Sequence, residues 1–189
     1  MGRRSVEKWR RTKGYRHPQL DSALRSSRIK TEVRLYREAR RLGVPVPILY
    51  DVDLAENRIV LEFVEGPTAK EVLTSGAGGA RDLCYRMGLL AGRLHAGDII
   101  HGDLTTSNMI LRGDRLYLVD FGLGEKSGDI EAKGVDLHLL REAFMSAHSD
   151  MMGLFDEVLR GYRDAYNGAE TVICKVGEIE KRGRYVGKR

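Results

Sequence analysis

The stretch His101-Gly102-Asp103-Leu104-Thr105-Thr106-Ser107-Asn108, together with Asp120-Phe121-Gly122 twelve residues after Asn108, decides how this chain is read. The two segments supply two carboxylates, Asp103 and Asp120, and the amide of Asn108. Carboxylate and amide oxygens are ligands that Mg²⁺ prefers, and a carboxylate can also orient or deprotonate an attacking hydroxyl or water. Transfer of a phosphoryl group uses both, because its charge must be neutralised and its attacker held in line. The pattern therefore indicates phosphoryl-transfer chemistry.

The residues between the two segments predict a β-hairpin. Met109-Ile110-Leu111 and Leu116-Tyr117-Leu118-Val119 are short apolar runs, and the polar turn between them contains a glycine. Such runs on either side of a turn are typical of paired antiparallel strands. Pairing would bring the two ends of the hairpin together. We therefore expect Asn108 and Asp120 to lie close enough to share a metal ion.

In residue type, spacing and order, the two segments resemble the catalytic loop and the metal-binding turn of protein kinases, with one arginine replaced by Gly102. The resemblance implies that Asp103 is the catalytic residue and that Asn108 and Asp120 bind Mg²⁺. An Asp-Phe-Gly sequence alone is often only a turn. The joint occurrence of both segments around a hairpin favours the phosphoryl-transfer site.

The N-terminal part predicts a helix with a buried carboxylate. Apolar residues recur at helical spacing until Gly43, and Asp21 or Ser22 offers a cap; the apolar positions are Ile29, Val33, Tyr36 and Ala39. Glu32 lies on this stripe and needs a cation partner if it faces the core. Lys8, in a short strand expected over 5–9, is a candidate because kinases pair a strand lysine with a glutamate of the next helix. Many other lysines and arginines lie nearby, so the pattern alone leaves the choice open.

A second apolar run, Ile59 to Val64, is bounded by Gly66-Pro67 and predicts the strand that leads into a hinge between two lobes. The adenine of a nucleotide usually pairs with backbone groups in such a segment. The nucleotide-binding residues expected here are Glu62, Phe63 and Val64. The alternative is an ordinary buried strand.

Composition and charge are consistent with a compact enzyme. The chain has 189 residues, 42% of them hydrophobic, which suits one domain or two small lobes that share a cleft. No apolar run approaches the roughly 18 residues needed to cross a bilayer, so we expect a cytosolic protein without membrane contact. Basic residues are dense over 1–41 and again over 181–189, although the net charge is only +5. These runs are either solvated surfaces or contacts to a phosphate-rich partner such as RNA.

Several further segments resemble the small atypical kinase of the KEOPS complex, called PRPK in animals. They are Lys13-Gly14-Tyr15-Arg16-His17-Pro18 with Leu20-Asp21, Glu32 with Arg34, residues 101–108, Gly134-Val135-Asp136-Leu137 and Arg182-Gly183-Arg184. The resemblance covers the chain from Lys8 onward. It implies that Lys8, rather than Lys13, binds the nucleotide and pairs with Glu32, and that ATP and Mg²⁺ are the cofactors. It also implies a threonylcarbamoyl-transferring subunit and a small regulatory subunit as partners, with tRNA reached through the basic N-terminal region and tail.

The chain also departs from that family. Family members begin with two strands and a phosphate loop containing Gly-Ala-Glu, whereas seven residues precede Lys8 here. We expect an α+β, protein-kinase-like bilobal fold with a reduced N-lobe over 1–65, which lacks those strands and that loop. A mostly helical C-lobe is expected over 66–175. A basic, extended C-terminal tail is expected over 176–189, because Gly183 and Gly187 argue against a rigid helix.

Three functions compete on this evidence. The first is an ATP- and Mg²⁺-dependent kinase-like ATPase of the KEOPS complex that supports threonylcarbamoyladenosine modification of tRNA. The second is a serine/threonine protein kinase acting in trans, which is weakened by the lack of an Ala-Pro-Glu motif and of a long activation segment between Asp120 and Asp136. The third is a nucleotide-binding pseudokinase scaffold.

Overall fold

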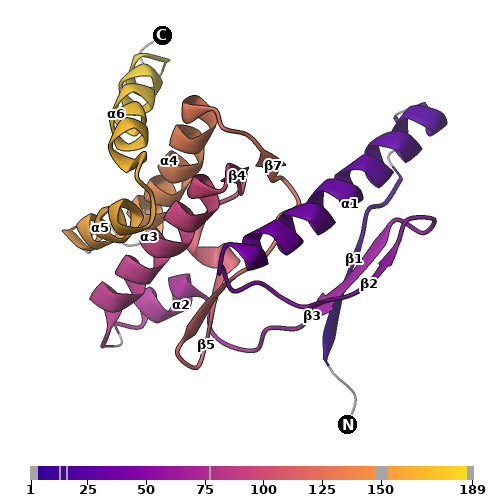
Figure 1. Ribbon diagram of the computed structural model, residues 1–189, viewed down its shortest axis with the longest axis horizontal. Helices are drawn as coiled ribbons and strands as arrows, with labels where there is room; N and C mark the ends of the chain where they lie inside the picture. Colours follow the sequence, from indigo (N-terminus) through magenta and orange to yellow (C-terminus); the bar gives the residue numbers. More distant parts are fainter. Residues whose placement is uncertain (1–3, 13, 16, 77, 148–152, 187–189) are drawn as a thin grey trace.

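The computed structural model describes residues 4–12, 14, 15, 17–76, 78–147 and 153–186. Within them the chain forms two lobes (Figure 1). A long helix and a three-stranded sheet form the N-lobe, and four further long helices gather in the C-lobe. This arrangement confirms the expected α+β, kinase-like bilobal fold. The basic residues Arg3, Lys13, Arg16, Lys188 and Arg189 lie outside the described residues.

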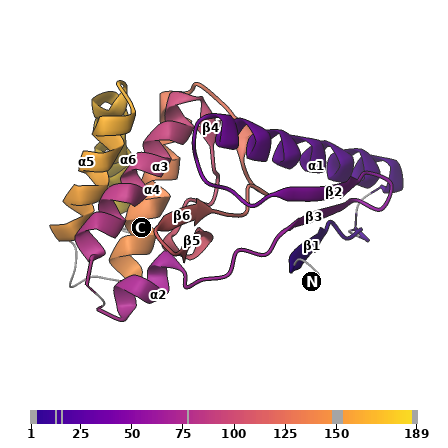
Figure 2. The ribbon, with the colours of Figure 1, turned by 60° about the horizontal axis from the view of Figure 1, so that its bottom comes forward.

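The N-lobe sheet has the strand order β1-β3-β2, and all its pairs are antiparallel. The strands are β1 (Ser5–Trp9), β2 (Leu49–Asp53) and β3 (Arg58–Glu62). Alternate residues of β3, Ile59 and Leu61, are buried in the same core cluster as Ile29 and Val33 of helix α1 (Pro18–Arg41). A strand buries every second side chain on one face, so this face of the sheet packs on α1 (Figure 2).

Helix α1 begins earlier than the sequence suggests. The expected cap at Asp21 or Ser22 is wrong, because the helix starts at Pro18 and His17 occupies the N-cap position without a side-chain cap. Proline fits the first turn, where its missing N–H needs no partner. Asp21 instead lies buried in that turn and accepts a hydrogen bond from Arg25 Nε at 2.7 Å.

The C-lobe consists of helices around a small hairpin. Its elements are α2 (Ala69–Thr74), α3 (Ala80–Ala96), β4 (Ile99–Ile100), the 3₁₀ turn Thr106–Asn108, β5 (Met109–Arg112), β6 (Arg115–Leu118), β7 (Glu125–Lys126), α4 (Ile130–Ala147), α5 (Phe155–Ala165) and α6 (Ala169–Val186). The hairpin β5–β6 confirms the strand pair expected from the sequence. Figure 2 shows it between the C-lobe helices and the N-lobe sheet.

Helices α3 and α5 pack with their backbones almost in contact. A Cβ atom added at Gly88 of α3 would lie 1.9 Å from Val158 O, and one added at Gly161 of α5 would lie 2.0 Å from Tyr85 O. Only glycine fits at these two crossing points. The close approach fixes the position of α3, which is followed by β4 and then by the loop over residues 101–108.

The C-terminal segment is helical, not extended. Helix α6 runs to Val186, so the expected boundary between residues 175 and 176 falls inside it, and the expected extended tail is wrong over the described residues. Apolar side chains Val172 and Val176 are buried on its inner face, and Arg182 pairs with Glu131 of α4. These interactions stabilise a helix that its glycines alone would weaken. No helix in the described part of the chain is both long and apolar enough to span a membrane.

The α3–α5 packing gives a prediction about stability. Gly161→Ala should lower the free energy of unfolding by about 1–3 kcal/mol, because the new methyl group collides with the carbonyl of Tyr85. Gly177→Ala is the matched control, since nothing lies within 4 Å of a Cβ at that helical position. It should raise the stability by about 0.5–1 kcal/mol. Urea denaturation of both variants tests this, and equal stabilities would contradict the packing.

Candidate active site

The hairpin brings Asn108 and Asp120 to neighbouring positions, as the sequence suggests. Met109 pairs with Leu118 in the ladder, and Val119 N donates to Asn108 O at 3.0 Å. The residues that flank the two strands therefore meet at the hairpin's open end. This placement is the first step in assembling the site.

Asn108 also fixes Asp103. Its amide nitrogen donates to Asp103 O at 2.9 Å and to Asp103 Oδ2 at 2.8 Å. Both donor hydrogens are thus used on Asp103, and the amide oxygen of Asn108 has no hydrogen bond within the described residues. That oxygen can serve as a metal ligand while the nitrogen holds the carboxylate of Asp103.

Asp120 has an unusual backbone and a shared carboxylate. Its φ of +63° lies in the left-handed region, which non-glycine residues adopt at a cost and mainly at functional sites. Oδ1 accepts from Gly122 N at 3.0 Å and from Lys8 Nζ at 2.7 Å, whereas Oδ2 has no partner in the described part of the chain. Burial alone would raise the pKa of Asp120, but the hydrogen bond and charge of Lys8 outweigh it and hold the pKa below its usual value. Asp120 is therefore a ready anionic ligand.

Lys8 and Glu32 form the pair expected from the kinase resemblance. Lys8 Nζ lies 2.6 Å from Glu32 Oε1, and the Glu32 side chain is only 1% exposed. Lys8 thus links β1, α1 and the Asp120 turn. Tyr36, one helical turn beyond Glu32, accepts a hydrogen bond from Asp120 N at 3.0 Å through its hydroxyl. Burial and the negative charge of Glu32 raise the pKa of Tyr36 well above its usual value, so the hydroxyl stays protonated.

Sequence reasoning missed one member of this cluster, Arg10. Its Nη2 lies 2.7 Å from Glu32 Oε2 and donates to Gly122 O at 3.1 Å. The signal that could have found it is its position two residues after Lys8, since residues i and i+2 of an extended segment share a face. Glu32 therefore pairs with two cations.

A series of buried hydrogen bonds links loop 101–108 to the C-lobe helices. Asp136 of α4 accepts hydrogen bonds from His101 N at 2.7 Å and Gly102 N at 2.9 Å. His95 Nε2 lies 3.2 Å from the same carboxylate, and its Nδ1 lies 2.7 Å from Tyr162 OH. The tautomer of His95 that fits both contacts carries its proton on Nε2, facing the carboxylate, and accepts a hydrogen bond from the Tyr162 hydroxyl at Nδ1. Three helices, α3, α4 and α5, thus hold two successive backbone N–H groups of the loop.

His101 is a neutral structural residue. Burial lowers its pKa, and the nearby Asp136 only partly opposes this. Nε2 lies 3.0 Å from Val119 O, and Nδ1 accepts from Asp103 N at 3.3 Å. The ring also packs against Phe121, with 4.7 Å between centroids. His101 therefore joins the catalytic loop to the end of the hairpin.

The structure explains why glycine replaces the usual arginine at position 102. Gly102 has a φ of +79°, and a Cβ there would lie 2.3 Å from Leu123 O. The segment after Asp120 passes directly over this position. A side chain would have to displace it.

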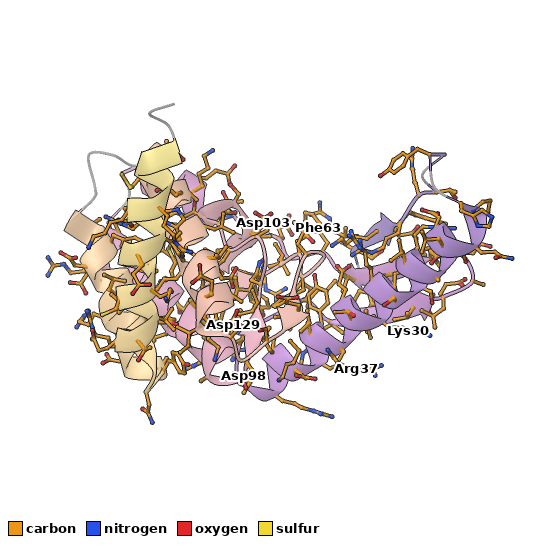
Figure 3. All side chains as sticks on the ribbon, turned by 90° about the horizontal axis from the view of Figure 1, so that it is seen from above. Lys30, Arg37, Phe63, Asp98, Asp103 and Asp129 are labelled. Atoms are coloured by element: carbon orange, nitrogen blue, oxygen red, sulfur yellow. The ribbon has the colours of Figure 1, made fainter. Side chains whose placement is uncertain are left out.

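The expected hinge residues have distinct surroundings. The Glu62 carboxylate is occupied, since Arg112 Nη1 lies 2.6 Å from Oε1 and Ile48 N donates to Oε2 at 3.0 Å. Phe63 N donates to Arg4 O at 3.1 Å. Val64 is buried, and its N–H has no acceptor among the described residues. Figure 3 shows Phe63 and Asp103 where the two lobes meet.

The donor set fits Mg²⁺ bound together with a nucleotide. In the described residues, no three His, Cys, Asp or Glu side chains converge on one point. The oxygens of Asn108 and Asp120 are a pair, and Mg²⁺ commonly takes one or two protein oxygens and completes its shell with phosphates and water. Such a pair suits a metal that arrives with its substrate.

Loop 101–108, the Asp120 turn beside it and a strand lysine paired with a helix glutamate together define a kinase-like protein. Comparison with known proteins refines the class. A RIO domain matches residues 3–123, more than half of the chain. KEOPS complex subunit Bud32 from Pyrococcus abyssi is 45% identical over 185 residues, which cover 95% of this chain and 84% of that subunit. The chain therefore belongs to the RIO domain family and, within it, to the atypical kinases of the KEOPS family.

Longer relatives also match. A probable bifunctional tRNA threonylcarbamoyladenosine biosynthesis protein from Methanosarcina mazei is 44% identical over 184 residues, which cover 97% of this chain but 32% of that protein. One from Methanobrevibacter smithii is 42% identical over 187 residues and is covered to 34%. The chain spans about a third of the length of these bifunctional relatives.

Solved structures agree on the fold alone. The Rio2 kinase of Chaetomium thermophilum, solved as an ADP/Mg²⁺-phosphoaspartate complex, has a TM-score of 0.59 at 17% sequence identity. The match covers 96% of this chain and 66% of the Rio2 chain. WaaP in complex with acyl carrier protein has a TM-score of 0.58 at 16% identity, covering 81% and 76%. Both support the kinase-like architecture.

The geometry at Gly102 gives a second prediction. Gly113, in the β5–β6 turn, also has a positive φ of +55° but has open space around its Cβ position. Gly113→Ala should cost about 1–2 kcal/mol of stability through backbone strain alone. Gly102→Ala should cost about 1–3 kcal/mol more, because the methyl group also meets Leu123 O. Thermal unfolding of the two variants measures the difference, and equal losses would contradict the close approach.

Proposed function

We propose that this protein is an ATP- and Mg²⁺-dependent kinase-like ATPase of the KEOPS complex, which supports threonylcarbamoyladenosine modification of tRNA in the cytoplasm. The observation that carries the proposal is the convergence of Lys8, Glu32 and Asp120 beside the Asp103–Asn108 pair. The relatives' names supply the biological setting, since they include a KEOPS subunit and tRNA threonylcarbamoyladenosine biosynthesis proteins.

In this proposal each residue has a separate task. Lys8 would leave Asp120 and bind the α- and β-phosphates, and Asn108 and Asp120 would hold Mg²⁺. Bound there, Mg²⁺ would supply positive charge to the transferring phosphoryl group. Asp103, fixed by Asn108, orients the attacking water or hydroxyl. Val64 N–H is a free donor for the adenine ring, with Glu62 and Phe63 forming the adjoining wall.

The proposed partners follow from the relatives. Bifunctional relatives are about three times as long as this chain, so a second activity accompanies the matched part in those proteins. We propose a threonylcarbamoyl-transferring KEOPS subunit and a small regulatory KEOPS subunit as partners, and the relatives' names support this setting. A protein kinase acting in trans is less well supported, because only seven residues separate Gly122 from the start of α4 at Ile130. Such a segment is too short to form a platform for a protein substrate.

The proposed tRNA surface lies on α1. Four exposed basic residues recur at intervals of four, three and four residues and so share one face of the helix over about 16 Å; they are Lys30, Arg34, Arg37 and Arg41. Arg37 and Arg41 also line a groove of about 460 Å³. In Figure 3, Lys30 and Arg37 lie on the side of α1 away from Asp103. The exposed end of α6, with Lys181 and Arg182, is a second basic surface. Phosphates could bind either surface without blocking the catalytic loop.

The catalytic assignment predicts a large loss of turnover. Asp103→Ala and Asp120→Ala should each lower the ATPase rate at least about a hundredfold, because one removes the group that orients the attacker and the other a metal ligand. The two effects should not multiply. Asp114→Ala in the hairpin turn is the control, since that exposed side chain has no hydrogen bond within the described residues, and it should leave the rate unchanged. ADP release is measured in parallel with phosphoprotein formation, with and without partner and tRNA.

Two outcomes would count against this assignment. Near-normal ADP release by a folded Asp103→Ala sample would remove Asp103 from the mechanism. Phosphoprotein formation equal to ADP release would favour a protein kinase over an ATPase.

The RNA surface predicts a change in salt dependence. The slope of log affinity for tRNA against log salt should flatten by roughly 0.7 to 0.9 for each phosphate group that a variant no longer binds. Arg37→Gln and Arg41→Gln should therefore weaken tRNA binding and flatten the slope, while the ATP affinity stays unchanged. Arg163→Gln on α5 is a control with the same change in charge. Lines that superimpose for all three variants would rule out α1 as the RNA surface.

A further inference from the structure

We propose that Arg10 is a positioning residue that keeps Glu32 paired and the Asp120 turn in place when Lys8 moves to a nucleotide. The inference rests on the proposed function, because it assigns a role within the same site. Arg10 would not touch the reacting atoms. It would act through Glu32 and through the backbone of Gly122.

The geometry of Glu32 is the first observation. Its carboxylate is 1% exposed, and each oxygen has its own cation: Oε1 lies 2.6 Å from Lys8 Nζ and Oε2 lies 2.7 Å from Arg10 Nη2. A buried carboxylate without a cation is strongly unfavourable. If one cation leaves, the other therefore still stabilises the buried Glu32 carboxylate.

The second observation is that Lys8 is shared. It pairs with Glu32 and also lies 2.7 Å from Asp120 Oδ1, so its single charge serves two carboxylates. Phosphate groups would compete with both for that charge. Mg²⁺ would compensate Asp120, but at Glu32 the only other cation within the described residues is Arg10. Release of Lys8 is thus favourable only if Arg10 stays.

The third observation is that hydrogen bonds hold both the backbone and the side chain of Arg10, and none of them involves Lys8. Its N donates to Asn57 O at 3.1 Å, and its carbonyl accepts from Arg25 Nη1 at 3.4 Å. Nη2 uses one hydrogen for Glu32 and the other for Gly122 O at 3.1 Å. A Cβ at Gly122 would lie 2.9 Å from Asp120 Oδ1, 3.3 Å from Arg10 Nη2 and 3.6 Å from Lys8 Nζ, so both cations converge on this glycine.

Burying the Arg10 side chain has a free-energy cost, which the proposed role explains. Arg10 Nε is buried and has no hydrogen-bond partner among the described residues. An unsatisfied buried donor is unfavourable. The guanidinium offsets this cost with two interactions that an apolar side chain could not make, the ion pair with Glu32 and the hydrogen bond to Gly122 O.

The test compares steady-state ATP hydrolysis by the full chain and its variants, in the presence of Mg²⁺. Arg10→Met should raise KM for ATP about tenfold or more and lower kcat by a smaller factor, because Lys8 then stays on Glu32. Arg10→Lys should recover most of the loss in KM, since it restores the charge. Arg11→Met is the matched control, because Arg11 is exposed and has no ion pair in the described part of the chain, and it should match the wild type.

A double variant separates this role from a general effect on the fold. Glu32→Gln removes the charge that needs Arg10. Adding Arg10→Met in that background should therefore change KM less than about twofold. Urea denaturation shows whether each variant is folded under the assay conditions.

The outcomes distinguish this inference from the proposed function. If the wild type hydrolyses ATP and Arg10→Met behaves like Arg11→Met, the role of Arg10 is wrong and the ATPase stands. An equal loss with and without Glu32→Gln would also overturn it. If the wild type shows no turnover, the proposed function is wrong, and titration of Mg-ADP into the same variants decides Arg10. About tenfold weaker binding by Arg10→Met supports the inference, and unchanged or undetectable binding by all variants overturns it.

Discussion

The structure depends on the burial of one carboxylate, that of Glu32. A charge with 1% exposure must be paired, and the partners available to it come from β1 and the residue just after it. This requirement draws the edge strand of the N-lobe sheet against α1 and aligns Lys8 and Arg10 on the same side. Because the two cations also contact Asp120 and Gly122, the same requirement joins the N-lobe to the turn after the hairpin. One electrostatic constraint thus sets the relation between the sheet, the helix and the Asp120 turn.

In the C-lobe, the buried polar side chains stabilise the backbone of loop 101–108 and do not compensate a charge on it. Asp136, His95 and Tyr162 place a chain of hydrogen bonds under the loop, and the close glycine packing between α3 and α5 fixes the helices that carry His95 and Tyr162. Packing supplies the rigidity, and the polar chain directs it to the peptides at His101 and Gly102. The loop can then present Asp103 without relying on its own conformational preferences.

Much of this arrangement could be predicted from local pattern. The hairpin and the α1 stripe follow from periodicity, whereas the pattern left the partner of Glu32 open and the family resemblance implied Lys8. Other features depend on tertiary interactions that no short window contains. The helical course of α6 comes from packing on α4, and the glycine at position 102 from a carbonyl twenty-one residues further along the chain. The start of α1 is different, because Pro18 is a local signal for the first helical turn that the sequence reasoning overlooked. Arg10 was missed because its significance lies in a charge balance among distant residues.

The ion pairs around Lys8 have a consequence for folding itself. Clefts lined by charges of one sign repel internally, and such sites often reduce the stability of the protein that carries them. Here Glu32 and Asp120 are balanced by Lys8 and Arg10 within the chain, so the four side chains sum to zero charge. Bringing these four side chains together therefore leaves no net charge among them. In the chain itself, the cations of the site act as counterions for its carboxylates.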